Sequence, residues 1–185
     1  MAAPTVLRFA NFQQFQNHIQ KAQVAGSQAI GGALYVVALR VLQGARDMIG
    51  KYHRSVGPYP KWDQLSIFTQ ANRAMLGFTV NDPLLRTGTL RDSYEAVMIG
   101  PYAAGVGSPL GAALGHEVGV PNNPIPNMGP IPPRPVLGPV VYRDQKKLIN
   151  KAGSVWYNAI FFARYRKSAS SMTFTNMDHF AEEAE

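Results

Sequence analysis

The chain has 185 residues, of which 46% are hydrophobic, and its formal net charge is +7. This length and apolar content favour a folded domain with its own core over disorder. The absence of cysteine excludes disulfides, thiolate chemistry and zinc sites built on cysteine, and it suits the cytoplasm. We expect a soluble protein with no signal peptide and no membrane contact, since no window reaches about 18 apolar residues.

The charge is unevenly distributed along the chain. The last eight positions hold four of the 11 acidic residues, so residues 1–177 carry all 18 basic residues against the remaining acidic ones. Residues 168–185 are small, polar and acidic, which is typical of a tail. The basic body is compatible with three roles: contact with DNA phosphates, a solvated face, or a complement to an acidic neighbouring protein.

Two helices are expected in the first part of the chain. Asn11 is a suitable cap for a long helix, in which residues 12–52 carry apolar side chains at helical spacing. Gly31 and Gly32 leave open one kinked helix or two consecutive helices. A short helix is then predicted within residues 62–76, which buries Leu65, Phe68 and Met75 and leaves Gln64, Gln70 and Arg73 in solvent.

A strand region is predicted from residue 90 to about residue 137. Thr87 and Gly88 indicate a tight turn, in which Gly88 adopts a positive φ, directly before a strand at residues 90–99. Gly100 and Pro101 end this strand, and residues 102–107 are predicted to return antiparallel to it.

Proline is concentrated in residues 120–139, which hold eight of the 14 prolines. Because proline donates no backbone hydrogen bond, this run is predicted to be an extended loop rather than an interior strand. We favour an arm that lies across a neighbouring subunit over a surface connector or a polyproline ligand. The candidate arm residues are Pro126, Pro132, Pro133, Arg134 and Pro135.

A second long helix is predicted at residues 141–166. Its apolar stripe includes Leu148, Val155 and Trp156, and one of the adjacent Phe161 and Phe162 is a candidate for contact with a partner chain. Its polar side carries a candidate contact to DNA or to an acidic partner, made of Arg143, Lys146, Lys147 and Lys151.

Motifs for enzyme chemistry are absent from the sequence. No glycine-rich phosphate loop and no Gly-x-Ser-x-Gly elbow occurs, and His116-Glu117 has no second histidine four residues after the first. We therefore expect no catalytic, cofactor or metal site and no enzymatic activity.

One stretch of sequence points to a family. The run Pro83-Leu84-Leu85-Arg86-Thr87-Gly88-Thr89-Leu90-Arg91-Asp92-Ser93 is followed in order by Val106-Gly107-Ser108, a His116-Glu117-Val118-Gly119 turn and Ile131-Pro132-Pro133-Arg134-Pro135-Val136-Leu137-Gly138. Upstream, Trp62, Leu65, Thr69 and Arg73 fit the same pattern. This ordered combination, over roughly residues 60–140, resembles the virion-morphogenesis and tail-completion proteins of tailed phages.

The resemblance implies an α+β fold: a small antiparallel sheet flanked by a long N-terminal helix and a C-terminal helix. It implies one domain over residues 1–167, with the proline-rich arm and the acidic tail added to it. Its motif residues Thr87, Gly88, Leu90, Ser93, Glu117 and Gly119 are expected to be structural.

The same resemblance implies a function in the virion, after assembly in the host cytoplasm. Such proteins form a ring, commonly hexameric, that joins the head connector in the neck to the tail tube. Expected partners are other copies of the chain, neck or connector proteins, and tail tube or tail terminator proteins, with at most non-specific contact with DNA. The alternatives are a basic DNA-binding module and a minor capsid-associated protein.

Overall fold

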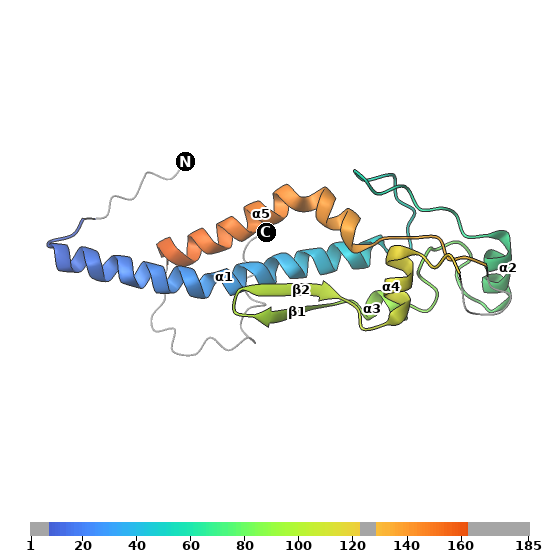
Figure 1. The fold of residues 1–185 in the computed structure, drawn as a ribbon, viewed down its shortest axis with the longest axis horizontal. Coiled ribbons are helices and arrows are strands. Elements are labelled where there is room, and N and C mark those ends of the chain that lie inside the picture. Colours follow the sequence, from blue (N-terminus) through green and yellow to red (C-terminus); the bar gives the residue numbers. More distant parts are fainter. Residues whose placement is uncertain (1–7, 123–128, 163–185) are drawn as a thin grey trace.

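A computed structural model describes residues 8–122 and 129–162 of the chain (Figure 1). Its longest element is helix α1 (Phe12–Met48). The Asn11 side chain caps this helix as predicted, because its Oδ1 accepts a hydrogen bond of 2.8 Å from the backbone N–H of Gln14. The helix passes through Gly31 and Gly32 without a break, so the single helix is the correct alternative.

Helix α5 (Leu137–Phe162) lies antiparallel along α1 (Figure 1). Glycines of α1 allow this close approach. A Cβ atom at Gly44 would lie 2.6 Å from Val140 Cγ1, and one at Gly26 would lie 3.1 Å from Ile160 Cδ1. The helix begins at Leu137 rather than at residue 141, and its predicted end at residue 166, like the predicted tail, lies outside the described residues.

Strands β1 (Glu95–Gly100) and β2 (Ala103–Gly107) form a two-stranded antiparallel sheet, in which Val97 pairs with Gly105. The turn of this hairpin lies against α1, since a Cβ atom at Gly31 would lie 2.8 Å from the carbonyl oxygen of Pro101. Ala96 and Met98 are half-buried while Val97 and Ile99 are exposed, which is the alternation of a sheet with one covered face. The predicted α+β fold is confirmed.

The beginning and the extent of the predicted strand region are wrong. Residues Thr89–Asp92 form a short helix, α3, and the first strand begins only at Glu95. A further helix, α4 (Gly111–Val118), lies within the stretch that was predicted to be strand. Between Gly107 and Leu137 the described residues pair only in one isolated bridge, Val120 with Ile131.

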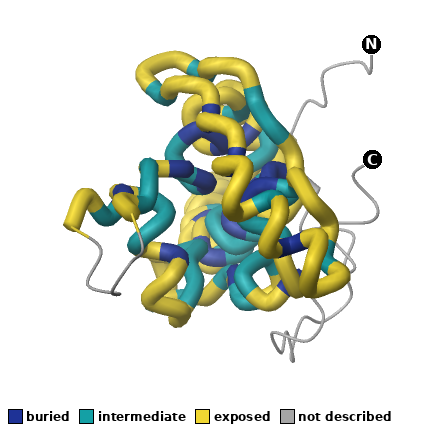
Figure 2. Tube along the Cα trace, turned by 90° about the vertical axis from the view of Figure 1, so that its right-hand side faces the viewer, coloured by how far each residue is buried: buried dark blue, intermediate teal, exposed yellow. Residues whose placement is uncertain are grey.

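The core lies where the C-terminal half of α1 meets the beginning of α5, and Figure 2 shows buried positions inside and exposed positions along the outer loops. Ala45 and Met48 of α1, Tyr94 before β1 and Val140 of α5 are buried there together. Trp62 belongs to the same buried cluster, and its indole Nε1 donates a 3.2 Å hydrogen bond to the carbonyl oxygen of Pro135. The two long helices and the hairpin therefore share one core.

Helix α2 (Ile67–Met75) is oriented opposite to the prediction. Phe68 is 88% exposed and Met75 is 86% exposed, whereas Arg73 is only 8% exposed. Leu65, just before the helix, is buried as predicted. Arg73 is buried because its Nη1 donates hydrogen bonds to the carbonyl oxygens of Asp82 (2.7 Å), Leu85 (3.3 Å) and Thr79 (3.5 Å).

Helix α1 contains a stretch that is long and apolar enough to cross a membrane, with a mean hydropathy of 1.4. This corrects the expectation that no such window exists. Length and composition alone do not identify a span, because core helices of water-soluble proteins pass the same test. Val41, Ala45 and Met48 of α1 contribute to the core described above.

Candidate assembly surfaces

The Thr-Gly motif holds the entry to the hairpin. Gly88 has the predicted positive φ, +87°, and lies at the N-terminus of α3. After α3, the hydroxyl of Ser93 donates a 2.7 Å hydrogen bond to the carbonyl oxygen of Leu90 and lies 2.7 Å from the hydroxyl of Ser108, just past β2. Thr87 Oγ1 lies 2.8 Å from Thr89 Oγ1. These motif residues make contacts within the fold.

Glu117 links α4 to α5. Its Oε1 accepts hydrogen bonds of 3.0 Å from the backbone N–H groups of both Val136 and Leu137, where α5 begins. A carboxylate at a helix N-terminus satisfies unpaired N–H groups and interacts favourably with the helix dipole. The predicted turn at residues 116–119 is wrong for its first three residues, which are helical, and only Gly119 turns, with φ +78°.

Arg134 lies inside its own chain. It is 5% exposed, its Nη2 donates a 3.0 Å hydrogen bond to the carbonyl oxygen of Asp63, and its backbone N–H donates to the carbonyl oxygen of His116. Burial and the charge of Arg134 lower the pKa of His116. Because an arm that reaches a neighbouring subunit requires exposed side chains, Arg134 is not one of its residues.

The rest of the candidate arm is divided between surface and interior. Val120 and Ile131 exchange backbone hydrogen bonds of 2.8 and 2.9 Å, which close the loop at its base. Pro133 is exposed, Pro132 and Pro135 are half-buried, and Pro126 lies outside the described residues. The proline-rich segment between the two bridge residues, which includes the exposed Pro121 and Pro130, remains the candidate arm.

The four basic residues of α5 share one region of its surface. Arg143, Lys146 and Lys147 are exposed and Lys151 is half-buried. Arg143 Nη2 contacts Asp144 Oδ2 at 2.6 Å, and Lys147 Nζ lies 4.0 Å from Asp144 Oδ1. The hydrogen bond from Arg143 lowers the pKa of Asp144, so this carboxylate stays ionised and offsets part of the positive field.

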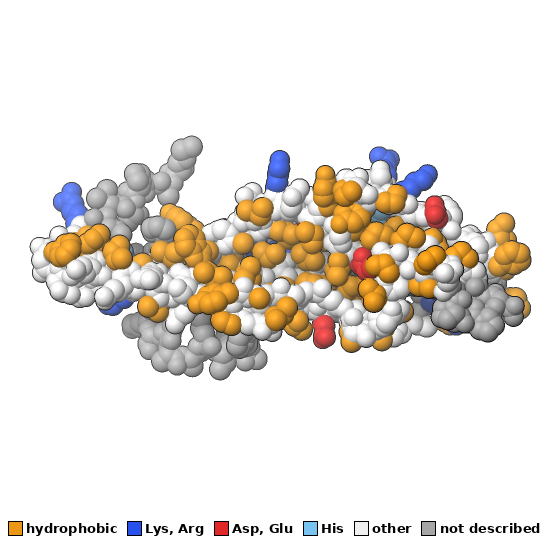
Figure 3. All heavy atoms as spheres, in the orientation of Figure 1, with side chains coloured by type: hydrophobic (Ala, Val, Ile, Leu, Met, Phe, Trp, Pro, Cys, Tyr) orange, Lys and Arg blue, Asp and Glu red, His pale blue; other side chains and the backbone are white. Residues whose placement is uncertain are grey.

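Two exposed apolar patches lie at opposite ends of the described fold (Figures 1 and 3). The tip patch consists of Phe12, Phe15 and Ile19 near the N-terminus of α1, where Phe12 is 71% exposed. The α2 patch consists of Ile67, Phe68 and Met75. Neither was predicted. A signal for the first was available, because residues 9–20 contain no charged side chain.

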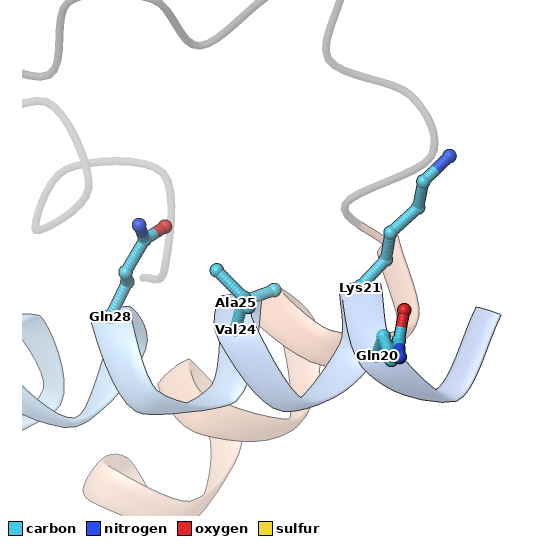
Figure 4. A pocket seen from close by; sticks show the side chains of 5 residues that line it. All are labelled: Gln20, Lys21, Val24, Ala25 and Gln28. Atoms are coloured by element: carbon cyan, nitrogen blue, oxygen red, sulfur yellow. The ribbon is translucent and has the colours of Figure 1, made fainter. Parts of the chain in front are cut away.

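Two features of the described residues bear on metal and ligand binding. They contain no group of three or more His, Asp or Glu side chains that could hold a metal ion. A shallow depression is lined by Gln20, Lys21, Val24, Ala25 and Gln28, all from one side of α1 (Figure 4). A surface formed by one helix face encloses no ligand, and Lys21 is its only titratable side chain.

Comparisons of the chain with models of protein families, with curated proteins and with solved structures found no match. The resemblance to tail-completion proteins therefore rests on the motifs of the sequence alone. The function has to be inferred from these motifs together with the surfaces described above.

Proposed function

We propose that this chain is a structural subunit of a tailed-phage virion: a neck or tail-completion protein that forms a ring between the head connector and the tail tube. The observation that carries this proposal is the pair of exposed apolar patches at the two ends of the fold. Large exposed apolar surfaces typically mark sites of protein association. The α+β fold with its small antiparallel sheet is the one that the family resemblance implies.

The contacts of the motif residues support a structural role. Gly88, Ser93 and Glu117 each stabilise a junction between elements, through a positive φ, a hydroxyl network and a helix cap. Contacts of this kind preserve the shape of a subunit. A joining protein requires only this, because its function is to present matched interfaces.

Electron microscopy of a phage lacking this protein tests the proposal. We expect filled heads and complete tails that fail to join, because the loss removes an interface rather than a reaction product. Supplying the intact chain from a plasmid is the control, and it should restore joined virions. Normal joined virions without the protein would contradict the proposal, and so would a complete absence of heads.

A second candidate function is DNA binding through the basic surface of α5, favoured by the exposure of Arg143, Lys146 and Lys147. Duplex binding by phosphate contacts falls steeply with salt, and its slope decreases by about one for each contact removed. A Lys146→Gln/Lys147→Gln variant tests this candidate. Arg91→Gln is the control, because it alters a basic residue of α3 instead. Tight binding at physiological salt that only the first variant weakens would favour the DNA-binding function.

A further inference from the structure

We infer that copies of this chain associate head to tail, the tip patch of one copy packing against the α2 patch of the next. This inference rests on the proposed function and names the surfaces that build the ring. It is carried by the position, chemistry and size of the two patches.

The tip patch continues an existing helix-packing face. Phe12, Phe15 and Ile19 are spaced by three and four residues, so they lie on one side of α1. Gly26, seven residues after Ile19, lies on the same side and faces α5, since a Cβ atom there would lie 3.1 Å from Ile160 Cδ1 and 3.6 Å from Trp156 Nε1. The face of α1 that packs on α5 therefore extends toward the N-terminus with its large apolar side chains exposed.

The α2 patch is exposed because the opposite side of α2 is held by polar contacts. Arg73 lies about half a helical turn away from Phe68 and Met75 and donates its hydrogen bonds to carbonyl oxygens of residues 79–85. Rotating α2 to bury Phe68 would break these hydrogen bonds and leave the carbonyl groups of Asp82 and Leu85, which are half-buried residues, without this donor. An apolar partner is therefore the way to cover Ile67, Phe68 and Met75.

The two patches are chemically matched. No charged residue occurs between residues 9 and 20, and the only charged residue of α2, Arg73, is buried. Contact between the patches would therefore remove apolar surface from water without desolvating a charge. Depletion of charge and enrichment in Phe and Met are typical of the centre of a protein interface.

Size and symmetry favour a head-to-tail contact between copies. The six side chains are between 41% and 88% exposed. At about 200 Å² for a large side chain, they offer roughly 800 Å², so the surrounding polar rim has to supply the rest of the more than ~1,000 Å² that a specific interface buries. A ring requires two different surfaces on each subunit, whereas a patch that contacts itself ends in a dimer.

A mixing experiment with two full-length variants tests this inference. The tip variant is Phe12→Asp/Phe15→Asp, and the α2 variant is Ile67→Asp/Phe68→Asp. We expect wild-type protein to form rings and each variant alone to be monomeric by light scattering. Mixed in equal amounts, the variants should form a dimer and nothing larger, because one intact tip patch meets one intact α2 patch.

A matched control carries Leu114→Asp/Ile149→Asp, which alters two other exposed apolar residues, in α4 and α5. It should assemble like wild type. Unchanged circular dichroism spectra and melting temperatures show that all variants are folded. The absence of cysteine allows a second measurement, because Phe15→Cys and Phe68→Cys proteins should form a disulfide with each other far more readily than with themselves.

Several outcomes would overturn the head-to-tail contact. Dimers of the α2 variant alone would indicate tip-to-tip pairing. A mixture of the variants that stays monomeric would also contradict the contact, and so would a wild-type protein that is monomeric at high concentration. Rings formed by the tip variant alone and by the α2 variant alone would also overturn it. If head-tail joining still required the protein in that case, the proposed function would stand and only the head-to-tail contact would be wrong. Normal virions without the protein would instead contradict the proposed function, whatever the mixing experiment shows.

Discussion

Two regions of this molecule are stabilised by opposite means. In the core between α1 and α5, small and branched apolar residues such as Ala45 and Val140 are buried against each other. At the α2 end, a buried arginine binds backbone carbonyl groups, and the apolar side chains of the helix point outward. The comparison shows that the amphipathic pattern of a helix does not by itself indicate which side is buried.

Further polar contacts, in addition to those of Arg73, stabilise the α2 end. The hydroxyl of Tyr52 accepts a 2.9 Å hydrogen bond from the backbone N–H of Leu65 and donates one of 2.7 Å to Asn81. Burial lowers the pKa of Arg73, but an arginine remains charged at any physiological pH. Its charge therefore strengthens the hydrogen bonds to the carbonyl groups.

The largest effect is expected from a cavity in the apolar region. Leu148 of α5 is buried in the core, so Leu148→Ala removes buried methyl groups and leaves a void. We expect a loss of about 2–4 kcal/mol in the free energy of unfolding, measured by urea denaturation. The neighbouring and exposed Ile149 provides the control, because Ile149→Ala should change this free energy by less than about 0.5 kcal/mol. A loss below that of the control would place the core elsewhere.

The second effect is expected at the polar region. Arg73→Met keeps a long side chain but leaves carbonyl groups of residues 79–85 without their donor, at a cost of about 1–3 kcal/mol. The effect should be local, because α2 contributes no residue to the core cluster. Hydrogen exchange should therefore accelerate in residues 66–86 and remain unchanged in α5. Equal acceleration in both regions would show that the α2 end and the core form one cooperative unit.

The features that were predicted correctly depend on local sequence. The Asn11 cap joins two residues only three positions apart, because its side chain accepts a hydrogen bond from the backbone N–H of Gln14. Gly88 adopts its positive φ within a tight turn. The long helices and the hairpin follow from periodicity and from the turn at Gly100 and Pro101. Each of these signals lies within a few residues of the structure that it predicts.

The features that were missed depend on contacts between distant segments. The orientation of α2 follows from carbonyl groups of residues 79–85, and the burial of Arg134 follows from the carbonyl oxygen of Asp63, which is 71 residues away. The sequence assigned Arg134 to an arm because it lies in a proline-rich run of a chain that resembles an assembly protein. The role of Glu117 as the cap of α5 also spans a loop, because its hydrogen-bond donors, Val136 and Leu137, lie 19 and 20 residues further along the chain.

A third, smaller effect is expected at the N-terminus of α5, next to the apolar core, where Glu117 of α4 caps the helix. Glu117→Ala removes the acceptor for the N–H groups of Val136 and Leu137 and should cost about 1 kcal/mol. Thermal unfolding measures this loss. Glu95→Ala is the control, because Glu95 is an exposed residue of β1. An equal effect of both substitutions would mean that the carboxylate of Glu117 contributes nothing specific to α5.

The smallest effect concerns the pH dependence at His116, near the junction of the two regions. Burial, followed by the charge of Arg134, lowers the pKa of His116 below its ordinary value near 6.5. The unfolded chain therefore binds this proton at a higher pH than the folded chain does. The stability is fully present above the unfolded pKa and is lost as the pH falls below about 6.5 toward the lowered folded pKa.

One histidine changes the free energy of unfolding by at most about 1.4 kcal/mol for each pH unit in this interval. We expect His116→Gln to flatten the stability of the protein between about pH 6.5 and the folded pKa of His116, while the wild-type protein loses stability over the same interval. Urea denaturation at a series of pH values measures both. Arg134→Met should also reduce the slope, because it removes the positive charge that disfavours protonated His116. An unaltered slope in His116→Gln would assign the pH dependence to the carboxylates instead, and the polar contacts around Arg134 would then tolerate a charged neighbour.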